Sequence, residues 1–162
     1  MDDITVRPAK EDELSAVAEL RWRWVLENGS SPGTGQEEFV RRFVSWVQVH
    51  KSSHHCLVMV RGEAVIGMAW LAIIQRVPTP HALDRASGDV QCVYVLPEHR
   101  DAGLGSRLIE AVVNLARELR LERLTVHSST RAISAYSRGG FVISPRLLQV
   151  ELGKTKGMSS ER

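Results

Sequence analysis

An apolar run, a turn with two glycines and an amphipathic run follow one another in residues 93–108, VYVLPEHRDAGLGSRL. The first run predicts a strand, and the last predicts a helix that begins near Gly103. The first N–H groups of a helix have no partner within it, so together with the helix dipole they attract anions. Gly103 and Gly105 allow a phosphate group to approach the backbone, and Arg100 adds a positive charge. The segment therefore predicts an anion-binding turn between a strand and a helix.

An alternative interpretation of the same segment is a plain strand–turn–helix whose glycines serve tight packing. Two other phosphate-binding motifs are excluded by the residues present. The dinucleotide fingerprint needs a third glycine, and that position holds Leu108. A Walker loop has a first glycine, four further residues and then Gly-Lys-Ser/Thr. This segment does not contain that sequence.

Hydrophobic periodicity and turn residues predict the elements on either side. The expected strands are residues 4–7, 56–60, 64–70, 90–96, 123–127, 141–143 and 147–150. The expected helices run from the acidic residues 11–13 to the loop at 28–33, from 34 through 47, from 103 to about 119 and from 131 to 138. Thr34 and Glu37 have the spacing of a capping box, and residues 78–88 are expected to form a loop. The order β-α-α-β-β-β-α-β-α-β-β predicts a mixed α/β sheet with helices on its faces.

Length and composition limit the class of protein. The 162 residues are enough for one domain, and 43% hydrophobic with 25% charged residues is ordinary for a globular chain. We expect that domain over residues 1–153 and a disordered tail over residues 154–162. The longest mainly apolar stretch, residues 64–74, is too short to span a bilayer, and no secretory signal is visible. A net charge of +2 is below that of a typical nucleic-acid-binding domain.

The cysteines and histidines predict neither a disulfide framework nor a metal site. Cys56 and Cys92 are the only cysteines, and neither has ligands at zinc spacing. His54, His55 and Cys56 are adjacent, but successive residues of a strand point to opposite faces. We therefore expect a cytoplasmic protein without a metal.

Two motifs in this order resemble those of the GCN5-related N-acetyltransferase (GNAT) family. Residues 100–105, RDAGLG, resemble its Arg/Gln-x-x-Gly-x-Gly/Ala signature, and the strand before them is similar to the family's fourth strand. Residues 132–141, AISAYSRGGF, are similar to its Ala-x-x-x-Tyr-x-x-x-Gly-Phe ending. The element order matches over about residues 4–152. The resemblance implies a single domain with a mixed, mostly antiparallel sheet flanked by helices.

The resemblance also implies acetyl-CoA as co-substrate and assigns residues to it. Backbone amides of the fourth strand would pair with the pantetheine arm, and Arg100 with the turn after it would hold the pyrophosphate. Tyr136 takes the position of the general acid that protonates the departing thiolate; the alternative is an aromatic that only anchors the last helix. The implied cofactor-binding residues are Val93, Tyr94, Val95, Arg100, Asp101, Ala102, Gly103, Leu104, Gly105 and Ser106.

The general base and the acceptor stay open. Family members that modify protein N-termini often carry a Glu on the fifth strand, and residues 125–129 contain no carboxylate. His127 has a suitable ordinary pKa, and Asp89 is a weaker candidate; a solvated surface histidine is the competing interpretation of His127. The acceptor would bind near residues 27–35, residues 78–84 and the last hairpin. The tryptophans at 22, 24 and 46 are pocket candidates, although aromatics at helical spacing are more often core.

These observations predict an N-acetyltransferase that transfers an acetyl group directly to a primary amine in a ternary complex. The acceptor is an amine-bearing small molecule or a protein amino group. The alternatives are an acyl-CoA-binding sensor or scaffold without turnover, and an RNA-directed acetyltransferase, which the weak positive charge disfavours. Dimers are common in the family, and no feature of this sequence establishes one.

Overall fold

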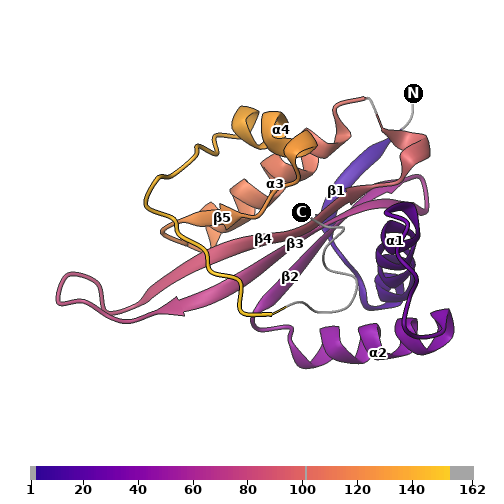
Figure 1. Cartoon of the computed structure of the whole chain (residues 1–162), viewed down its shortest axis with the longest axis horizontal. Helices are drawn as coiled ribbons and strands as arrows, with labels where there is room; N and C mark the ends of the chain where they lie inside the picture. Colours follow the sequence, from indigo (N-terminus) through magenta and orange to yellow (C-terminus); the bar gives the residue numbers. More distant parts are fainter. Residues whose placement is uncertain (1–2, 101, 154–162) are drawn as a thin grey trace.

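The structure is a computed structural model that describes residues 3–100 and 102–153. It contains one five-stranded sheet of order β1-β2-β3-β4-β5, in which the first four strands are antiparallel and β5 runs parallel to β4 (Figure 1). The strands are β1 Ile4–Pro8, β2 His54–Arg61, β3 Ala64–Arg76, β4 Arg85–Val95 and β5 Leu124–Val126. The helices are α1 Leu14–Glu27, α2 Gln36–Val49, α3 Leu104–Glu118 and α4 Ile133–Arg138, with 3-10 turns η1 Glu11–Glu13, η2 Pro97–His99 and η3 Thr130–Ala132. The predicted single mixed α/β domain is confirmed.

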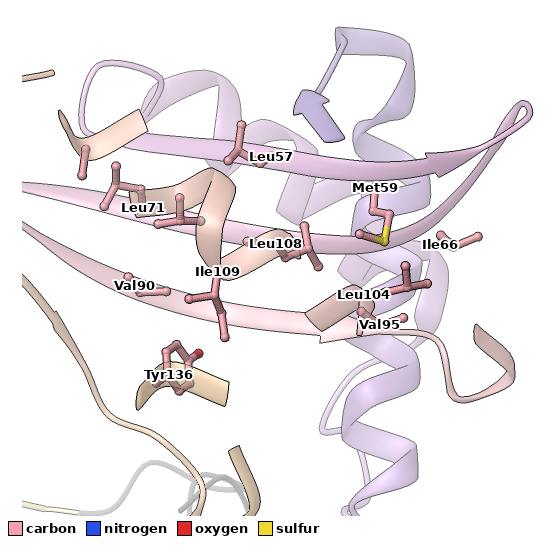
Figure 2. Packing of buried hydrophobic residues seen from close by; sticks show 13 residues of the cluster. Leu57, Met59, Ile66, Leu71, Val90, Val95, Leu104, Leu108, Ile109 and Tyr136 are labelled. Atoms are coloured by element: carbon pink, nitrogen blue, oxygen red, sulfur yellow. The ribbon is translucent and has the colours of Figure 1, made fainter. Parts of the chain in front are cut away.

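The helices cover both faces of the sheet because the strand residues alternate between two cores. Leu57 and Met59 of β2 pack in a cluster with α3 and α4, whereas Val58 and Val60 pack in a second cluster with α1 and α2. Figure 1 shows the two helix pairs on opposite sides of the sheet, and Figure 2 shows the first cluster from close by. No helix in residues 3–100 and 102–153 is long and apolar enough to cross a membrane.

The first two helices begin differently from the prediction. The acidic residues 11–13 form η1 ahead of α1, where the Glu13 carboxylate accepts hydrogen bonds from the Arg7 guanidinium at 2.7 and 2.8 Å. This pairing lowers the pKa of Glu13 to about 2. The predicted capping box at Thr34 is wrong: Gly35 precedes the first turn of α2, and the Thr34 hydroxyl donates to Glu38 instead.

β3 and β4 are longer than predicted and form an arm that projects from the sheet (Figure 1). Pairing continues to Arg76 opposite Arg85, so residues 85–88 of the predicted loop belong to β4, whereas residues 78–84 of it lie between the strands as predicted. The Arg85 guanidinium holds the base of the arm through the carboxylate of Glu122 at 2.8 Å and the carbonyl of Val77 at 2.6 Å.

The two last predicted strands are wrong. Residues 141–153 contain no strand, and six large apolar side chains between 142 and 152 are exposed, with 88% of Ile143 accessible. A two-stranded hairpin alone is marginal in water. The nearest edge, β5, is only three residues long, so the hairpin has little backbone with which to pair. The predicted tail at 154–162 lies outside the described residues.

β4 changes its neighbours halfway along its length, and this change creates the site described below. β5 pairs only with Gly88, Asp89 and Val90. Immediately afterwards, β4 has one residue more than β3 between two paired positions, and Cys92 adopts a φ of 53°. Such a bulge bends and twists the strand. Beyond Val90, no described strand pairs with the outer edge of β4, so the sheet opens there.

A substitution at Gly67 tests how closely β3 and β4 pack behind this opening. A Cβ at Gly67 would lie 2.9 Å from the backbone oxygen of Tyr94, so Gly67→Ala must displace the paired strand β4. We expect the variant to lose about 1–3 kcal/mol of unfolding free energy, measured by urea denaturation at pH 7. Gly33→Ala is the matched control, since nothing in the described residues lies within 4 Å of its Cβ position. Equal urea midpoints for the two variants would contradict this packing.

Candidate active site

The turn predicted to bind an anion leads from η2 into α3. Gly103 immediately precedes the helix with a φ of 72°, a left-handed conformation that favours glycine. No side chain caps the helix within the described residues. The first backbone bond into this turn is donated by Arg107 to the carbonyl of Gly103, which leaves the amides of residues 104–106 without a partner inside the helix. The local geometry is that of an anion site at a helix N-terminus.

Gly105 distinguishes this site from a glycine turn used for packing. It lies inside the first turn of α3, where glycine costs roughly 1 kcal/mol relative to alanine. No described atom lies within 4 Å of the position its Cβ would occupy, and the same is true of Gly103. The packing interpretation of the two glycines is therefore contradicted for Gly105. Amides without a partner inside the helix, next to space that no described atom fills, suit a ligand that approaches the backbone.

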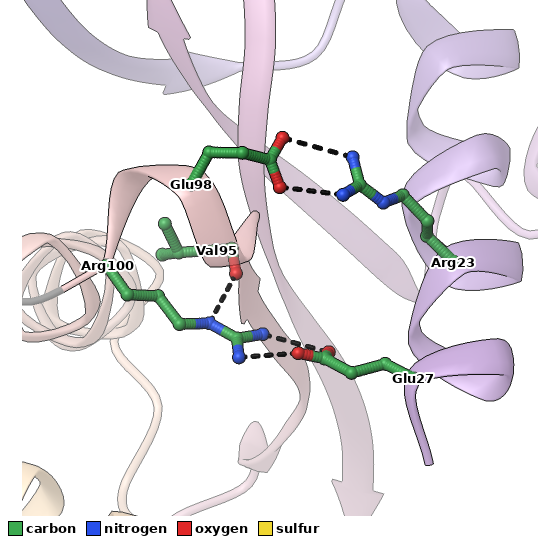
Figure 3. Close-up of polar contacts among 5 residues, drawn as sticks. All are labelled: Arg23, Glu27, Val95, Glu98 and Arg100. Carbon is green, nitrogen blue, oxygen red and sulfur yellow. Dashed lines mark hydrogen bonds and ion pairs between the residues drawn. The ribbon is translucent and has the colours of Figure 1, made fainter. Parts of the chain in front are cut away.

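Arg100 is paired within the protein rather than extended from the turn. Its Nε donates to the carbonyl of Val95 at 2.8 Å, and its two terminal nitrogens donate to the carboxylate of Glu27 at 2.6 and 3.0 Å (Figure 3). This contact lowers the pKa of Glu27. A second ion pair, between Arg23 and Glu98 at 2.6 Å, joins the same two elements. The assignment of Arg100 to a pyrophosphate stays a prediction, and in this structure Arg100 links α1 to the turn.

Arg138 brings a positive charge to the turn that the residue pattern does not single out. Its guanidinium, at the end of α4, donates to the hydroxyl of Ser106 at 3.3 Å. It stands at a variable position of the tyrosine-containing motif, so only the folded chain reveals its place. Ala102 and Leu104 flank Gly103 in the chain, and their assignment to the cofactor stays a prediction; Asp101 lies outside the described residues.

The three predicted residues of β4 present backbone rather than side chains at the opening. The side chain of Val93 packs on the α3 cluster, and that of Tyr94 stacks on Trp24 of α1 with ring centroids 5.4 Å apart. Burial raises the pKa of Tyr94 to about 12. Val95 pairs with Gly67 on the β3 side. Because no described strand covers the other edge, an extended ligand has room to pair there as an added strand would.

Tyr136 lies on the side of β4 opposite β3 (Figure 2). It is buried in the α3 cluster, and its ring packs edge-on against Phe141 at 5.3 Å. Burial, with a smaller contribution from Cys92, raises the pKa of Tyr136 to about 12. Tyr136 therefore anchors α4 and also keeps its proton at neutral pH, as a general acid must.

The two candidate bases have different surroundings. His127 is exposed just after β5. Asp89 lies in β4, where its carboxylate accepts hydrogen bonds from Thr125 at 3.2 Å and from the Gln91 amide at 3.0 Å. Among the described residues, no group of three His, Cys, Asp or Glu side chains is placed to hold a metal ion.

A pocket of about 230 Å³ opens on the α1–α2 face beside the bulge. It is lined by Arg21, Phe43, Trp46, His54, Trp70, Gln91 and Cys92. Of the three tryptophans predicted from the sequence, only Trp46 lines it; Trp24 stacks on Tyr94 and Trp22 packs on Phe39 at 5.9 Å. A larger groove of about 630 Å³ is lined by residues of α1 and α2 alone.

Several solved structures with the same fold are described as acetyltransferases. A predicted acetyltransferase from Clostridium acetobutylicum, crystallised with acetyl-CoA, is 20% identical, with a TM-score of 0.73 over 93% of this chain and 97% of that one. An acetyltransferase from Trypanosoma brucei is 24% identical, with a TM-score of 0.72 over 93% of this chain and 100% of that one. Glucosamine-6-phosphate N-acetyltransferase from Arabidopsis thaliana is 15% identical, with a TM-score of 0.70 over 93% of this chain and 99% of that one. At these identities the likeness shows the fold. None of the curated proteins matches the chain.

The sequence itself matches a family model. The model described as the acetyltransferase (GNAT) family matches residues 15–141. That region includes the open edge of β4, the turn before α3 and Tyr136. The chain therefore belongs to the acetyltransferase (GNAT) family.

Proposed function

We propose that this protein is an N-acetyltransferase that transfers the acetyl group of acetyl-CoA directly to a primary amine in a ternary complex. Gly105 is the observation that carries the proposal. Gly105 lies inside the first turn of a helix, with no described atom within 4 Å of its Cβ position and beside amides that have no partner inside the helix, and a phosphate that must come close explains it. Family membership supports the same donor, because acetyltransferases of this family use acetyl-CoA.

The residues present fit acetyl-CoA. The amides of residues 104–106 and the guanidinium of Arg138 would hold the pyrophosphate, and the open edge of β4 would pair with the pantetheine arm. For Arg100 to contact the phosphates as the family resemblance implies, it would have to exchange Glu27 for them. Acetyl-CoA supplies the acetyl group as a thioester, which an amine attacks without a covalent enzyme intermediate.

The chain contributes acid–base chemistry to this reaction. Tyr136 holds its proton at neutral pH and would donate it to the departing thiolate. An alkylammonium with a pKa of 10.4 is neutral in roughly one molecule in two thousand at pH 7, a cost of roughly 4.6 kcal/mol, so a proton acceptor assists the attack. Asp89 is the candidate that the structure links to the pocket, because Gln91, which donates to it, lines that pocket. An N–H on the open edge of β4 would stabilise the oxyanion.

The second candidate function is an acyl-CoA-binding sensor or scaffold without turnover. The absence of a carboxylate on β5, Leu124–Val126, and the exposure of His127 favour it. Such a protein would bind acetyl-CoA and release no thiol with any amine. In either case we propose a cytoplasmic location.

Gly105→Leu tests the phosphate site without straining the fold, unlike a substitution at Gly103, whose φ is 72°. Acetyl-CoA at 100 times its Kd stabilises a protein by about 2.7 kcal/mol, so we expect the Tm of the wild type to rise by roughly 5–10 °C. Gly105→Leu should have the wild-type Tm or higher without ligand and lose most of this rise. Gly33→Leu, at an open loop glycine, should keep it. A full rise in Gly105→Leu would overturn the placement of the site.

The variant Tyr136→Phe tests whether the protein is an acetyltransferase or a sensor without turnover. The variant keeps the ring that packs on Phe141, so its Tm and its acetyl-CoA shift should equal those of the wild type. We expect kcat to fall about 10²–10⁴-fold in a thiol-release assay with the best amine of a screened panel. Unchanged kcat would remove Tyr136 from the chemistry. No thiol release from the wild type with any amine, despite a normal thermal shift, would select the sensor.

A further inference from the structure

The pocket beside the bulge has walls made mainly of aromatic rings. Phe43 meets Trp70 edge-on with ring centroids 5.8 Å apart, and Trp46 meets Trp70 at 6.4 Å. These residues come from α2 and β3, which lie far apart along the chain. One face of Trp46 is already stacked on His50 at 4.2 Å. The parts of these side chains that line the cavity can contact a further ring, which aromatic side chains bind in stacked or edge-to-face geometry.

The pocket adjoins the segment of β4 that the proposed function assigns to the donor. Cys92, the residue at the bulge, lines the pocket, and it is also close enough to Tyr136 to contribute to the raised pKa of that tyrosine. Cys92 also directly precedes Val93, so a ligand in the pocket and a thioester on the open edge of β4 would contact the same stretch of that strand. Such a ligand is placed to be the amine acceptor.

The volume of the pocket limits the size of the group it accepts. At about 230 Å³ it exceeds a dry apolar cavity of about 150 Å³ that holds benzene. It is smaller than the pockets of about 300–1,000 Å³ that enclose drug-sized ligands. The pocket therefore has about the room that one six-membered ring needs together with a short alkyl chain, and a fused ring with the same chain would extend beyond it.

The charge of the pocket limits the acceptor further. Arg21 brings the one formal charge among the lining residues, and its guanidinium lies 4.7 Å above the ring of Trp24. No carboxylate lines the described pocket. Burial, followed by the charges of His50 and His55, lowers the pKa of His54, so the imidazole in the wall is neutral at pH 7. A polyamine would bring a second ammonium group into a pocket whose described lining holds a cation and no carboxylate.

We propose that this pocket binds the ring of the acceptor, and that the acceptor is a primary amine carrying a single aromatic ring on a short alkyl chain. The inference rests on the proposed function and names its substrate class. The ammonium first releases one proton to the proton acceptor, for which Asp89 is the candidate, and the neutral amine forms the C–N bond to give the tetrahedral oxyanion. The C–S bond breaks as the oxyanion collapses, and the thiolate takes the proton of Tyr136. The second amine proton restores Tyr136 through solvent.

The experiment compares amines and variants in two assays. Thiol release with acetyl-CoA is measured for phenethylamine, naphthylethylamine, n-butylamine and spermidine, and tryptophan fluorescence is titrated with phenethylamine in the presence of CoA. We expect the wild type to favour phenethylamine in kcat/KM by more than about tenfold over each of the other three. We also expect the titration to quench its fluorescence.

Trp46→Ala widens the pocket and keeps the fold, since the side chain is 42% exposed. We expect the Michaelis constant for phenethylamine to rise about tenfold and the naphthyl amine to become a better substrate than in the wild type. The Michaelis constant for acetyl-CoA should not change. A merely structural role for Trp46 would not produce that gain. Trp22→Ala is the matched control, because Trp22 packs on Phe39 outside the pocket, and both amines should behave as in the wild type.

The outcomes separate the two proposals. Faster acetylation of n-butylamine or spermidine than of phenethylamine would overturn the inference and leave the acetyltransferase in place. Absence of turnover with every amine, combined with a fluorescence quench that Trp46→Ala removes, would overturn the proposed function and support the ring site. Absence of a quench in the wild type would overturn the ring site.

Discussion

The loss of one strand neighbour halfway along β4 is the constraint on which the rest of the structure depends. Gly88 holds β4 against β5, because a Cβ there would lie within 2.8 Å of the side chains of Leu71, Leu121 and Leu124. Two residues later the pairing ends, and the extra residue at Cys92 turns the strand. A fully paired β4 would have no edge for a ligand and no room for Tyr136 beside it. The bulge therefore provides both the donor edge and the floor of the aromatic pocket.

Much of the fold was predictable because its elements have strong local patterns. The order of the helices and strands as far as α4 follows from the hydrophobic periodicity, the turn residues and the two glycines at the start of α3. The prediction of a final hairpin is wrong because the alternation at 141–150 produces a strand only where a sheet edge is available for pairing. β5 has three residues and offers little backbone for such pairing. The arm beyond Trp70 was missed because pairing opposite Arg85, not local pattern, extends β3.

The candidate site was predictable only where one segment builds it. The turn at 103–106 is contiguous, so its free amides follow from the sequence. The pairing of Arg100 with Glu27 joins residues 73 positions apart, and no spacing rule links them. The aromatic pocket draws its walls from five elements, which explains why the tryptophans were ambiguous as core or lining. Asp89 and Arg138 likewise acquire their partners only through the folded chain.

The ion pairs between α1 and the turn have a consequence for ionic strength. Arg23 and Glu98 are about half exposed, at 49% and 52%, whereas Arg100 and Glu27 are at 27% and 31%. Dissolved salt screens exposed charges more strongly than sheltered ones. The outer pair therefore loosens first as salt is added, and Arg100 and Glu27 then hold α1 to the turn. Salt acts on this region twice, through the phosphates of the ligand and through the protein's own charges.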